Sequence, residues 1–204
     1  MARKNKVPEF EKMARELKKN ASRYAASESV KFFRESFVKG GFTDTSFEKW
    51  TQTGNPMAGK RTMYNKGRLM RSIKKLSASL NRVVVVADSE YADIHNKGGY
   101  IVVTAQMKKY FWYKYYSFVG DVSVNKKGAT PLNKRNVGLG KKAMFCKAMA
   151  LKPVGSKIKI PKHQFMGNSR TMMRDFDKWF GDTIKFQIEK QWNKPTINID
   201  LKSV

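Results

Sequence analysis

Two stretches, one near each end of the chain, carry the periodicity of a long amphipathic helix, and they restrict the fold more than any other feature. Apolar side chains recur at steps of three and four within residues 8–39 and at steps of four within residues 171–193. A repeat near 3.6 residues places such side chains on one face of a helix. The positions are Phe10, Met13, Leu17, Ala21, Tyr24, Val30, Phe33 and Phe37 in the first stretch and Phe176, Phe180, Ile184, Ile188 and Trp192 in the second. Gly40 and Gly41 are expected to end the first helix, because glycine readily takes the left-handed conformation that follows many helices.

The middle of the chain shows the patterns of short strands. Residues 72–89, "SIKKLSASLNRVVVVADS", predict two strands, and the valine run 83–86 is typical of a strand shielded on both faces. Residues 100–104 and 156–160 predict two further strands. The expected fold class is therefore α+β, a small antiparallel sheet packed by long N- and C-terminal helices, in a single domain over residues 1–204.

Three connecting segments complete this outline. Residues 43–50, "TDTSFEKW", predict a short capped turn of helix, and residues 51–62 predict a turn-rich loop. The C-terminal tail, residues 194–204, alternates like an extended strand without a partner of its own. We expect this tail to pair with a sheet edge or with a neighbouring subunit.

Residues 105–155 form a basic, aromatic-rich insertion. Two apolar stretches flank the Gly-, Asn- and Lys-rich segment 121–140, which predicts a helical hairpin with a mobile loop. The insertion holds eleven Lys and Arg but a single acid, Asp121, so it carries about +10 of net charge. Its aromatic run, "YFWYKYY", has three possible roles: packing against the sheet, contact with another chain, or stacking with the bases of single-stranded nucleic acid. Packing against the sheet and contact with another chain explain the aromatic run best, because so many rings on three helical turns cannot all point in one direction.

The charge of the whole chain points to an anionic partner. Forty-two Lys and Arg stand against sixteen Asp and Glu, a net charge of +26, which burial, counterions or a partner must offset. Nucleic acid is the first candidate, and an acidic membrane surface is the second, although no apolar run approaches the roughly 20 residues that span a bilayer. The N-terminus lacks the apolar region of a secretory signal, so a cytosolic origin is expected. The single cysteine, Cys146, is expected to be a small buried apolar group.

An enzyme is the third class to weigh. "GNPMAGKR", residues 54–61, matches a phosphate-binding loop up to its last position, where Arg61 replaces the Ser or Thr that would bind magnesium. Asp88 follows an apolar run, as the acid of a nucleotide site does. The loop neither follows a buried strand nor opens a helix, however, and Lys60 is better explained as part of a flexible basic loop.

The two histidines give little support for catalysis or metal binding. His95 and His163 lack any metal-binding spacing, and Ser89, Asp93 and His95 lie too close in sequence to align as a catalytic triad. We therefore expect a structural His95 whose ring nitrogen bonds a backbone carbonyl near the glycine pair. No cofactor and no metal are expected.

The ordered motifs "NKGRLMRSI" (65–73), a valine strand, "YADIHNKGG" (91–99) and "IPKHQFMGNS" (160–169) resemble the bacteriophage virion morphogenesis family, the tail completion group that includes the G protein of phage Mu. Lys66, His163 and Met166 depart from the family's usual residues. The matching positions are Leu69, Ser72, Ile73, Tyr91, Ala92, Ile94, His95, Gly98, Gly99, Pro161, Phe165 and Gly167.

The resemblance implies a non-catalytic structural protein of tail completion or head–tail joining. Its expected place is the virion neck or upper tail, after assembly in the host cytoplasm, with phage neck and tail proteins as partners and no membrane. It implies a homo-oligomeric ring, with a hexamer as the natural expectation. It also implies that "YADIHNKGG" is a corner between strands, in which Tyr91 and Ile94 pack inward and the glycines allow a reversal.

The basic residues are candidate contacts to packaged DNA or to acidic neighbours. Such phosphate contacts are independent of sequence and weaken with salt. The candidates are Lys60, Arg61, Arg68, Arg71, Lys108, Lys109, Lys126, Lys127, Lys134, Arg135, Lys141 and Lys142. The alternative function is a sequence-nonspecific basic nucleic-acid-binding protein that acts as a monomer without forming a ring.

Overall fold

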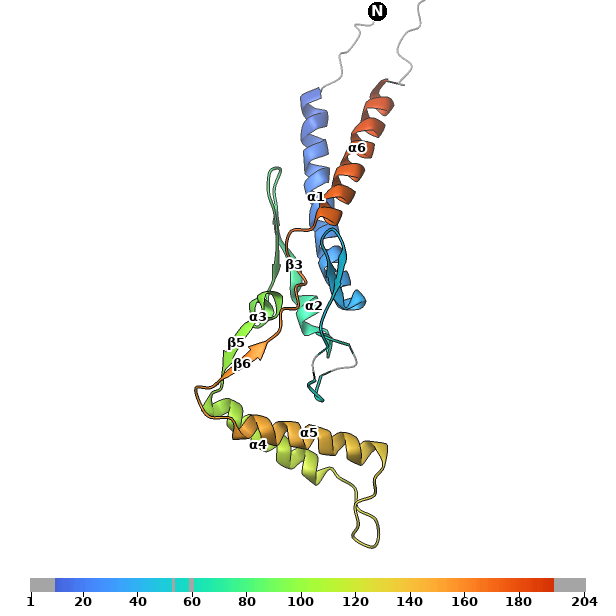
Figure 1. The fold of residues 1–204 in the computed structure, drawn as a ribbon. Coiled ribbons are helices and arrows are strands. Elements are labelled where there is room, and N and C mark those ends of the chain that lie inside the picture. The colour runs from blue at the N-terminus through green and yellow to red at the C-terminus, as the bar shows by residue number, and fades with distance from the viewer. Residues whose placement is uncertain (1–9, 53, 59–60, 193–204) are drawn as a thin grey trace, which may run out of the picture.

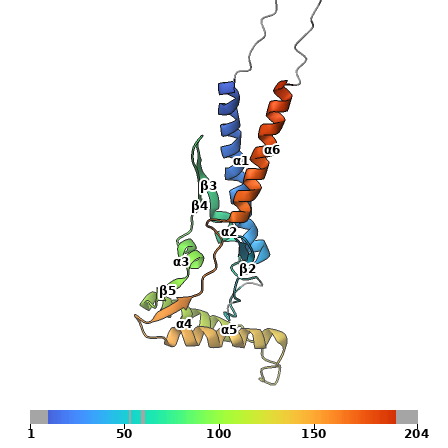
Figure 2. The same cartoon turned by 45° about the horizontal axis from the view of Figure 1, so that its top comes forward.

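The computed structural model describes residues 10–52, 54–58 and 61–192, except for the side chains of residues 191 and 192. The predicted extended tail, residues 194–204, lies outside the described residues. The described molecule is elongated (Figure 1). Helices α1 (Phe10–Lys39) and α6 (Arg170–Trp192) lie side by side at one end, and the hairpin of α4 (Ala105–Gly120) and α5 (Lys134–Leu151) lies across the other end. Figure 2 shows the same separation of the two ends from a second direction. The four predicted helices are confirmed, and Gly40 follows α1 with a φ of 71° as expected.

Six strands form three separate two-stranded antiparallel sheets between these ends. The pairs are β1 (Gly41–Thr43) with β2 (Phe47–Lys49), β3 (Ile73–Ala78) with β4 (Val83–Ala87), and β5 (Gly99–Val102) with β6 (Lys157–Ile160). The expected α+β class and the hairpin insertion are confirmed. The strands do not join into one sheet, however, because β3 and β4 lie along α1 whereas β5 and β6 lead away from it into the α4–α5 hairpin.

Two expectations about the strands are wrong. The valines of β4 are half-buried at every position rather than shielded on both faces, and their partner strand β3 is exposed after Ile73. Residues 43–49 belong to the β1–β2 hairpin, which spans residues 41–49, rather than to a helical turn. Its turn residue Asp44 is held by α6, since the Asp44 carbonyl accepts from Thr171 N–H at 3.0 Å and its carboxylate accepts from Arg170 N–H at 2.9 Å.

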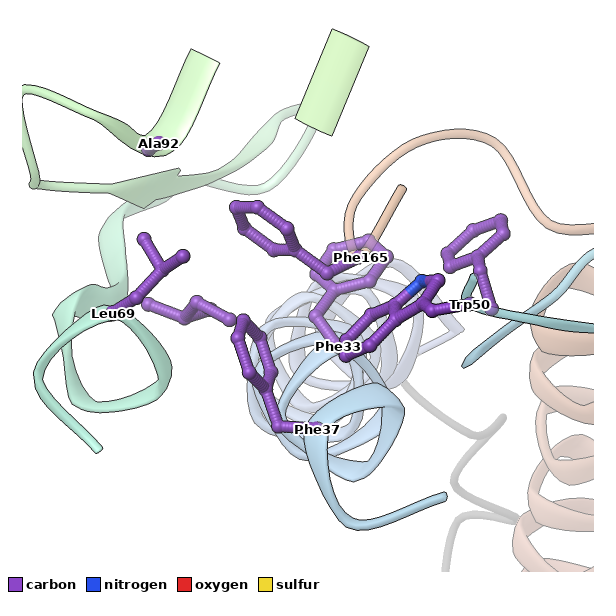
Figure 3. Close-up of a cluster of buried hydrophobic side chains, with 8 residues drawn as sticks. Phe33, Phe37, Trp50, Leu69, Ala92 and Phe165 are labelled. Carbon is purple, nitrogen blue, oxygen red and sulfur yellow. The ribbon is translucent and has the colours of Figure 1, made fainter. Parts of the chain in front are cut away.

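Two short helices complete the fold: α2 (Arg68–Ser72) and α3 (Ala92–Lys97). The core lies where α1, α2, α3 and the strand-free segment after β6 meet (Figure 3). There the aromatic rings of Phe37, Trp50 and Phe165 pack together, with centroids 5.3 Å apart for Phe37 and Trp50 and 5.1 Å apart for Phe37 and Phe165. The buried members of this core are Phe33, Phe37, Phe42, Trp50, Leu69, Ile73, Ala92 and Phe165.

The α4–α5 hairpin, which we call the arm, is built from two capped helices that pack mainly on each other. Thr104 accepts from Met107 N–H at the start of α4, and Asn133 accepts from Asn136 N–H at the start of α5. Because α5 begins at Lys134, the second part of the expected mobile loop is helical. Buried Asn136 then donates from Nδ2 to the carbonyls of Ser123 and Pro131, which holds the connecting loop against α5.

Much of the long-helix surface is uncovered. None of the described side chains of α4 or α6 is buried, and α4, which carries the aromatic run, packs mainly on α5 rather than on a sheet. Among the described residues, 21 large hydrophobic side chains are exposed. No helix in the described part of the chain is long and apolar enough to cross a membrane.

Candidate functional site

Two of the motif segments, 91–99 and 160–169, meet through the side chain of Asn96, near the end of α3. Its Oδ1 accepts from the backbone N–H groups of Phe165 at 2.8 Å and Met166 at 3.0 Å. Its Nδ2 donates to the carbonyl of Met166 at 3.0 Å. One amide therefore fixes the segment that carries Phe165 into the core. Sequence reasoning missed Asn96, because its partners lie about 70 residues away and no local pattern reveals them.

The two histidines lie together beside this contact. The backbone N–H of His163 donates to the carbonyl of His95 at 2.8 Å. The buried ring of His163 has its Nε2 2.9 Å from the carbonyl of Thr51, and since a carbonyl only accepts, Nε2 is the donor. Trp50 donates from Nε1 to the carbonyl of Gln164 at 2.7 Å. The segment 163–165 is thus tied both to α3 and to the strand region after α1.

The glycine pair allows this close approach. Gly98 has a φ of 73°, and a Cβ at this residue would lie 2.9 Å from the backbone nitrogen of Lys162. A Cβ on Gly99 would lie 2.8 Å from Cδ1 of Ile94. These contacts explain why "YADIHNKGG" ends in two glycines, as the expectation of a reversal requires.

Two details of the expected corner are wrong. Tyr91 is 39 % exposed rather than packed inward, because it precedes α3 at the surface and sets its ring edge-on to His95. The His95 ring does not tie the backbone: its Nδ1 is buried without a hydrogen-bond partner, and the backbone carbonyl makes the contact instead. Burial lowers the pKa of His95, and the charge of nearby His163 adds to the effect.

The remaining motif residues divide between core and surface. Leu69, Ile73, Ala92 and Phe165 belong to the buried core. Ser72 donates from its hydroxyl to the carbonyl of Leu69 at 2.7 Å, which closes the last turn of α2. Half-buried positions are Ser72, Ile94, His95, Gly98, Gly99 and Pro161, and the exposed positions are Tyr91 and Gly167.

The candidate basic contacts fall into two groups. Arg61 and Arg68 line one surface pocket together with Lys66 and His95, and Arg71 donates to the carbonyl of Lys66 at 2.8 Å. Lys60 lies outside the described residues. The other candidates are on the arm: Lys108, Lys109, Lys126, Lys127, Lys134, Arg135, Lys141 and Lys142.

A contact between two sulfur atoms joins the arm to the wall of the pocket. The Sγ of Cys146 on α5 lies 3.3 Å from the Sδ of Met57, a residue of the pocket wall. Cys146 is fully buried, as expected for a small apolar group, and burial raises the pKa of its thiol. The arm therefore touches the loop that carries Arg61.

The acidic residues that were weighed as parts of an enzyme site form ion pairs with lysines instead. Asp88 forms an exposed ion pair with Lys74, which holds the pKa of its carboxyl below the usual value through a hydrogen bond and charge attraction. Asp93 pairs with Lys97 at 2.9 Å rather than with His95. The strand before the described residues 54–58 is the exposed β2, and after Arg61 the next described helix begins only at Arg68. Within the described ranges no three His, Cys, Asp or Glu side chains gather to hold a metal.

The chain was compared with protein families, with curated proteins and with solved structures, and no match was found in any of the three. The site is therefore defined by its own geometry. It consists of a corner that locks the motif segments together, with a basic pocket and a basic arm beside it.

Proposed function

We propose that this protein is a non-catalytic structural component of a bacteriophage particle, which completes the tail or joins it to the head as a homo-oligomeric ring. One observation carries the proposal. The motif segments that resemble the virion morphogenesis family come from separate parts of the chain, yet Leu69, Ala92 and Phe165 meet in one core around α1. A shared core is what the proposal expects if these motifs form one structural unit.

The uncovered surface supports an assembling protein. A chain that folds alone buries most of its large apolar side chains, whereas α4 and α6 have none buried among their described residues. Their exposed apolar side chains include Tyr113 at 67 % and Phe186 at 60 %. Burial against neighbours would offset the cost of exposing this surface to water.

The arm is the part best placed to reach a neighbouring copy. Exposed apolar side chains on α5 recur at seven-residue steps, at Val137, Met144 and Leu151. This spacing keeps them on one helix face, as at a helix–helix seam. Because α5 has no acid and the insertion 105–155 carries about +10 of net charge, copies repel each other and assembly should strengthen as salt screens that repulsion.

Electron microscopy combined with sedimentation velocity tests the proposal. The purified protein should form closed rings, with six subunits as the expected number, and the ring fraction should rise from low to high salt. Antibody labelling should place the protein at the neck or upper tail of particles made from the phage that encodes it. A monomer at every salt concentration, absent from particles, would contradict the proposal.

A sequence-nonspecific nucleic-acid-binding protein is the second candidate. It is favoured by the basic residues themselves, since Arg61 and Arg68 form no ion pair among the described residues and neither α4 nor α5 contains an acid. This function predicts the opposite salt response, because added salt weakens phosphate contacts. Tight DNA binding by a monomer that never forms a ring would favour it.

A further inference from the structure

A surface pocket of about 460 Å³ lies between the loop after β2, the start of α2 and the start of α3. Its lining includes three cations, Arg61, Lys66 and Arg68, and three rings, those of Tyr64, Tyr91 and His95. The size is within the usual range for pockets that hold small ligands.

The charge of this pocket is unbalanced. No Asp or Glu lines it, and none of its three cations forms an ion pair with an acid in the described ranges. By contrast, Lys74 and Lys97 nearby are both paired with aspartates. Three unpaired cations around one hollow repel each other, and an anion between them would relieve that repulsion.

The positions of the cations are partly fixed. The guanidinium carbon of Arg61 lies 5.6 Å from the centre of the Tyr64 ring, a cation–π contact. Arg71 donates to the carbonyl of Lys66 at 2.8 Å and so ties down the chain between Lys66 and α2. Gly67, buried with a φ of 70°, sets the turn that places Lys66 and Arg68 on either side of it.

We propose that this pocket binds a phosphate group. Two guanidinium groups and an ammonium group supply the charge-assisted hydrogen bonds that phosphate oxygens accept, and arginine can bind two of those oxygens at once. The His95 ring also lines the pocket, and burial lowers the pKa of its imidazole.

A free phosphate, a mononucleotide and the backbone of nucleic acid share this chemistry. Tyr64 and Tyr91 on the pocket wall would pack against the sugar or base of the two larger ligands. The proposal does not depend on assembly into a ring, so the pocket can bind phosphate whether or not the protein belongs to a phage particle.

Calorimetric titration of the full chain with inorganic phosphate and with dAMP, together with fluorescence anisotropy on a short DNA duplex, tests this site. In the double variant Arg61→Gln with Arg68→Gln, affinity should fall by about tenfold or more for the probes that use the pocket. The control is Arg15→Gln with Arg23→Gln, which removes the same charge from exposed positions of α1 and should leave phosphate and dAMP affinity unchanged.

The three probes separate the possible sources of the phosphate. If the Arg61→Gln, Arg68→Gln variant loses affinity for phosphate and dAMP, the pocket is a small-molecule site. If it loses affinity for the duplex alone, the pocket contacts the nucleic-acid backbone. Equal losses in the pocket pair and the α1 pair, or no binding of any probe by the unchanged protein, would overturn the proposal. Urea unfolding confirms that each variant is folded, and Arg61→Lys with Arg68→Lys, which keeps the charge, should retain part of the affinity.

Discussion

The backbone N–H of Phe165 donates to Oδ1 of Asn96 over 2.8 Å, although 69 residues separate the two in the chain. The same oxygen accepts from Met166, so one side chain satisfies two backbone groups at the edge of the core. This contact decides where the segment after β6 crosses α3, and with it the position of the buried Phe165 ring.

Replacing Asn96 with Ala should therefore destabilise the fold. The change leaves two backbone N–H groups and one carbonyl without partners, which costs about 2–3 kcal/mol in the free energy of unfolding. Urea unfolding followed by tryptophan fluorescence measures this loss. Asn125→Ala, in the exposed loop of the arm, is the control and should change the global stability little, since its bonds stay within residues 125–129. Equal stability of Asn96→Ala and the unchanged protein would show that the contact is dispensable.

Gly98→Ala should also destabilise the protein. Its φ of 73° is strained for any residue with a Cβ, and that atom would lie 2.9 Å from the nitrogen of Lys162, so a cost of about 1–3 kcal/mol is expected. Gly138→Ala provides the matched comparison, because Gly138 lies within α5 and an added Cβ meets nothing within 4 Å. There the same change should stabilise by about 0.5–1 kcal/mol. Thermal unfolding of the two variants should move in opposite directions.

His95 should make stability depend on pH. Its pKa in the folded protein is lowered from the ordinary 6.5, so the folded state disfavours the protonated ring. The stability is fully present above pH 6.5 and is lost as pH falls through the lower, folded pKa. Urea midpoints measured between neutral and mildly acidic pH should fall in the unchanged protein and fall less in His95→Gln. Parallel curves for the two proteins would show that His95 does not carry this dependence.

Changing the exposed α5 face should block assembly while the fold persists. Met144→Ser with Leu151→Ser removes two side chains that are 67 % and 61 % exposed in the single chain, each worth about 1.5–3 kcal/mol when buried at an interface. Sedimentation velocity at high salt should show rings for the unchanged protein and smaller species for the variant. Val38→Ser, at a 63 % exposed position of α1, serves as the control for loss of an apolar group elsewhere. Rings of normal size in the α5 variant would place the subunit contact on another surface.

The elements of this fold could be predicted where the information is local. The steps of three and four in α1 and the steps of four in α6 depend on neighbours within a few residues, and both helices form as expected. The β1–β2 hairpin could not be predicted in this way, because its turn residue Asp44 accepts hydrogen bonds from the start of α6, more than 120 residues further along the chain. Strand patterns likewise predicted the strands but not that they would form three separate pairs.

The sequence shows which kinds of residue form the candidate site, but it does not show how they are arranged in space. The motif positions Leu69, Ala92 and Phe165 are apolar and lie in the buried core, whereas Tyr91, which was expected to pack inward, is exposed. Asn96 and the pairing of the two histidines depend on segments that approach only in three dimensions. The basic pocket could be recognised only in the three-dimensional structure. The sequence shows the charges of Arg61 and Arg68, but it does not show that no acid lines the pocket around them.

The chain enters and leaves the arm at a pair of facing residues, Val102 and Lys157, at the ends of β5 and β6, and the arm meets the body again where Cys146 contacts Met57. A chain that leaves and returns through hydrogen-bonded neighbours can be closed there by a tight turn. We therefore expect β5 and β6 to stay paired when the arm is shortened to such a turn.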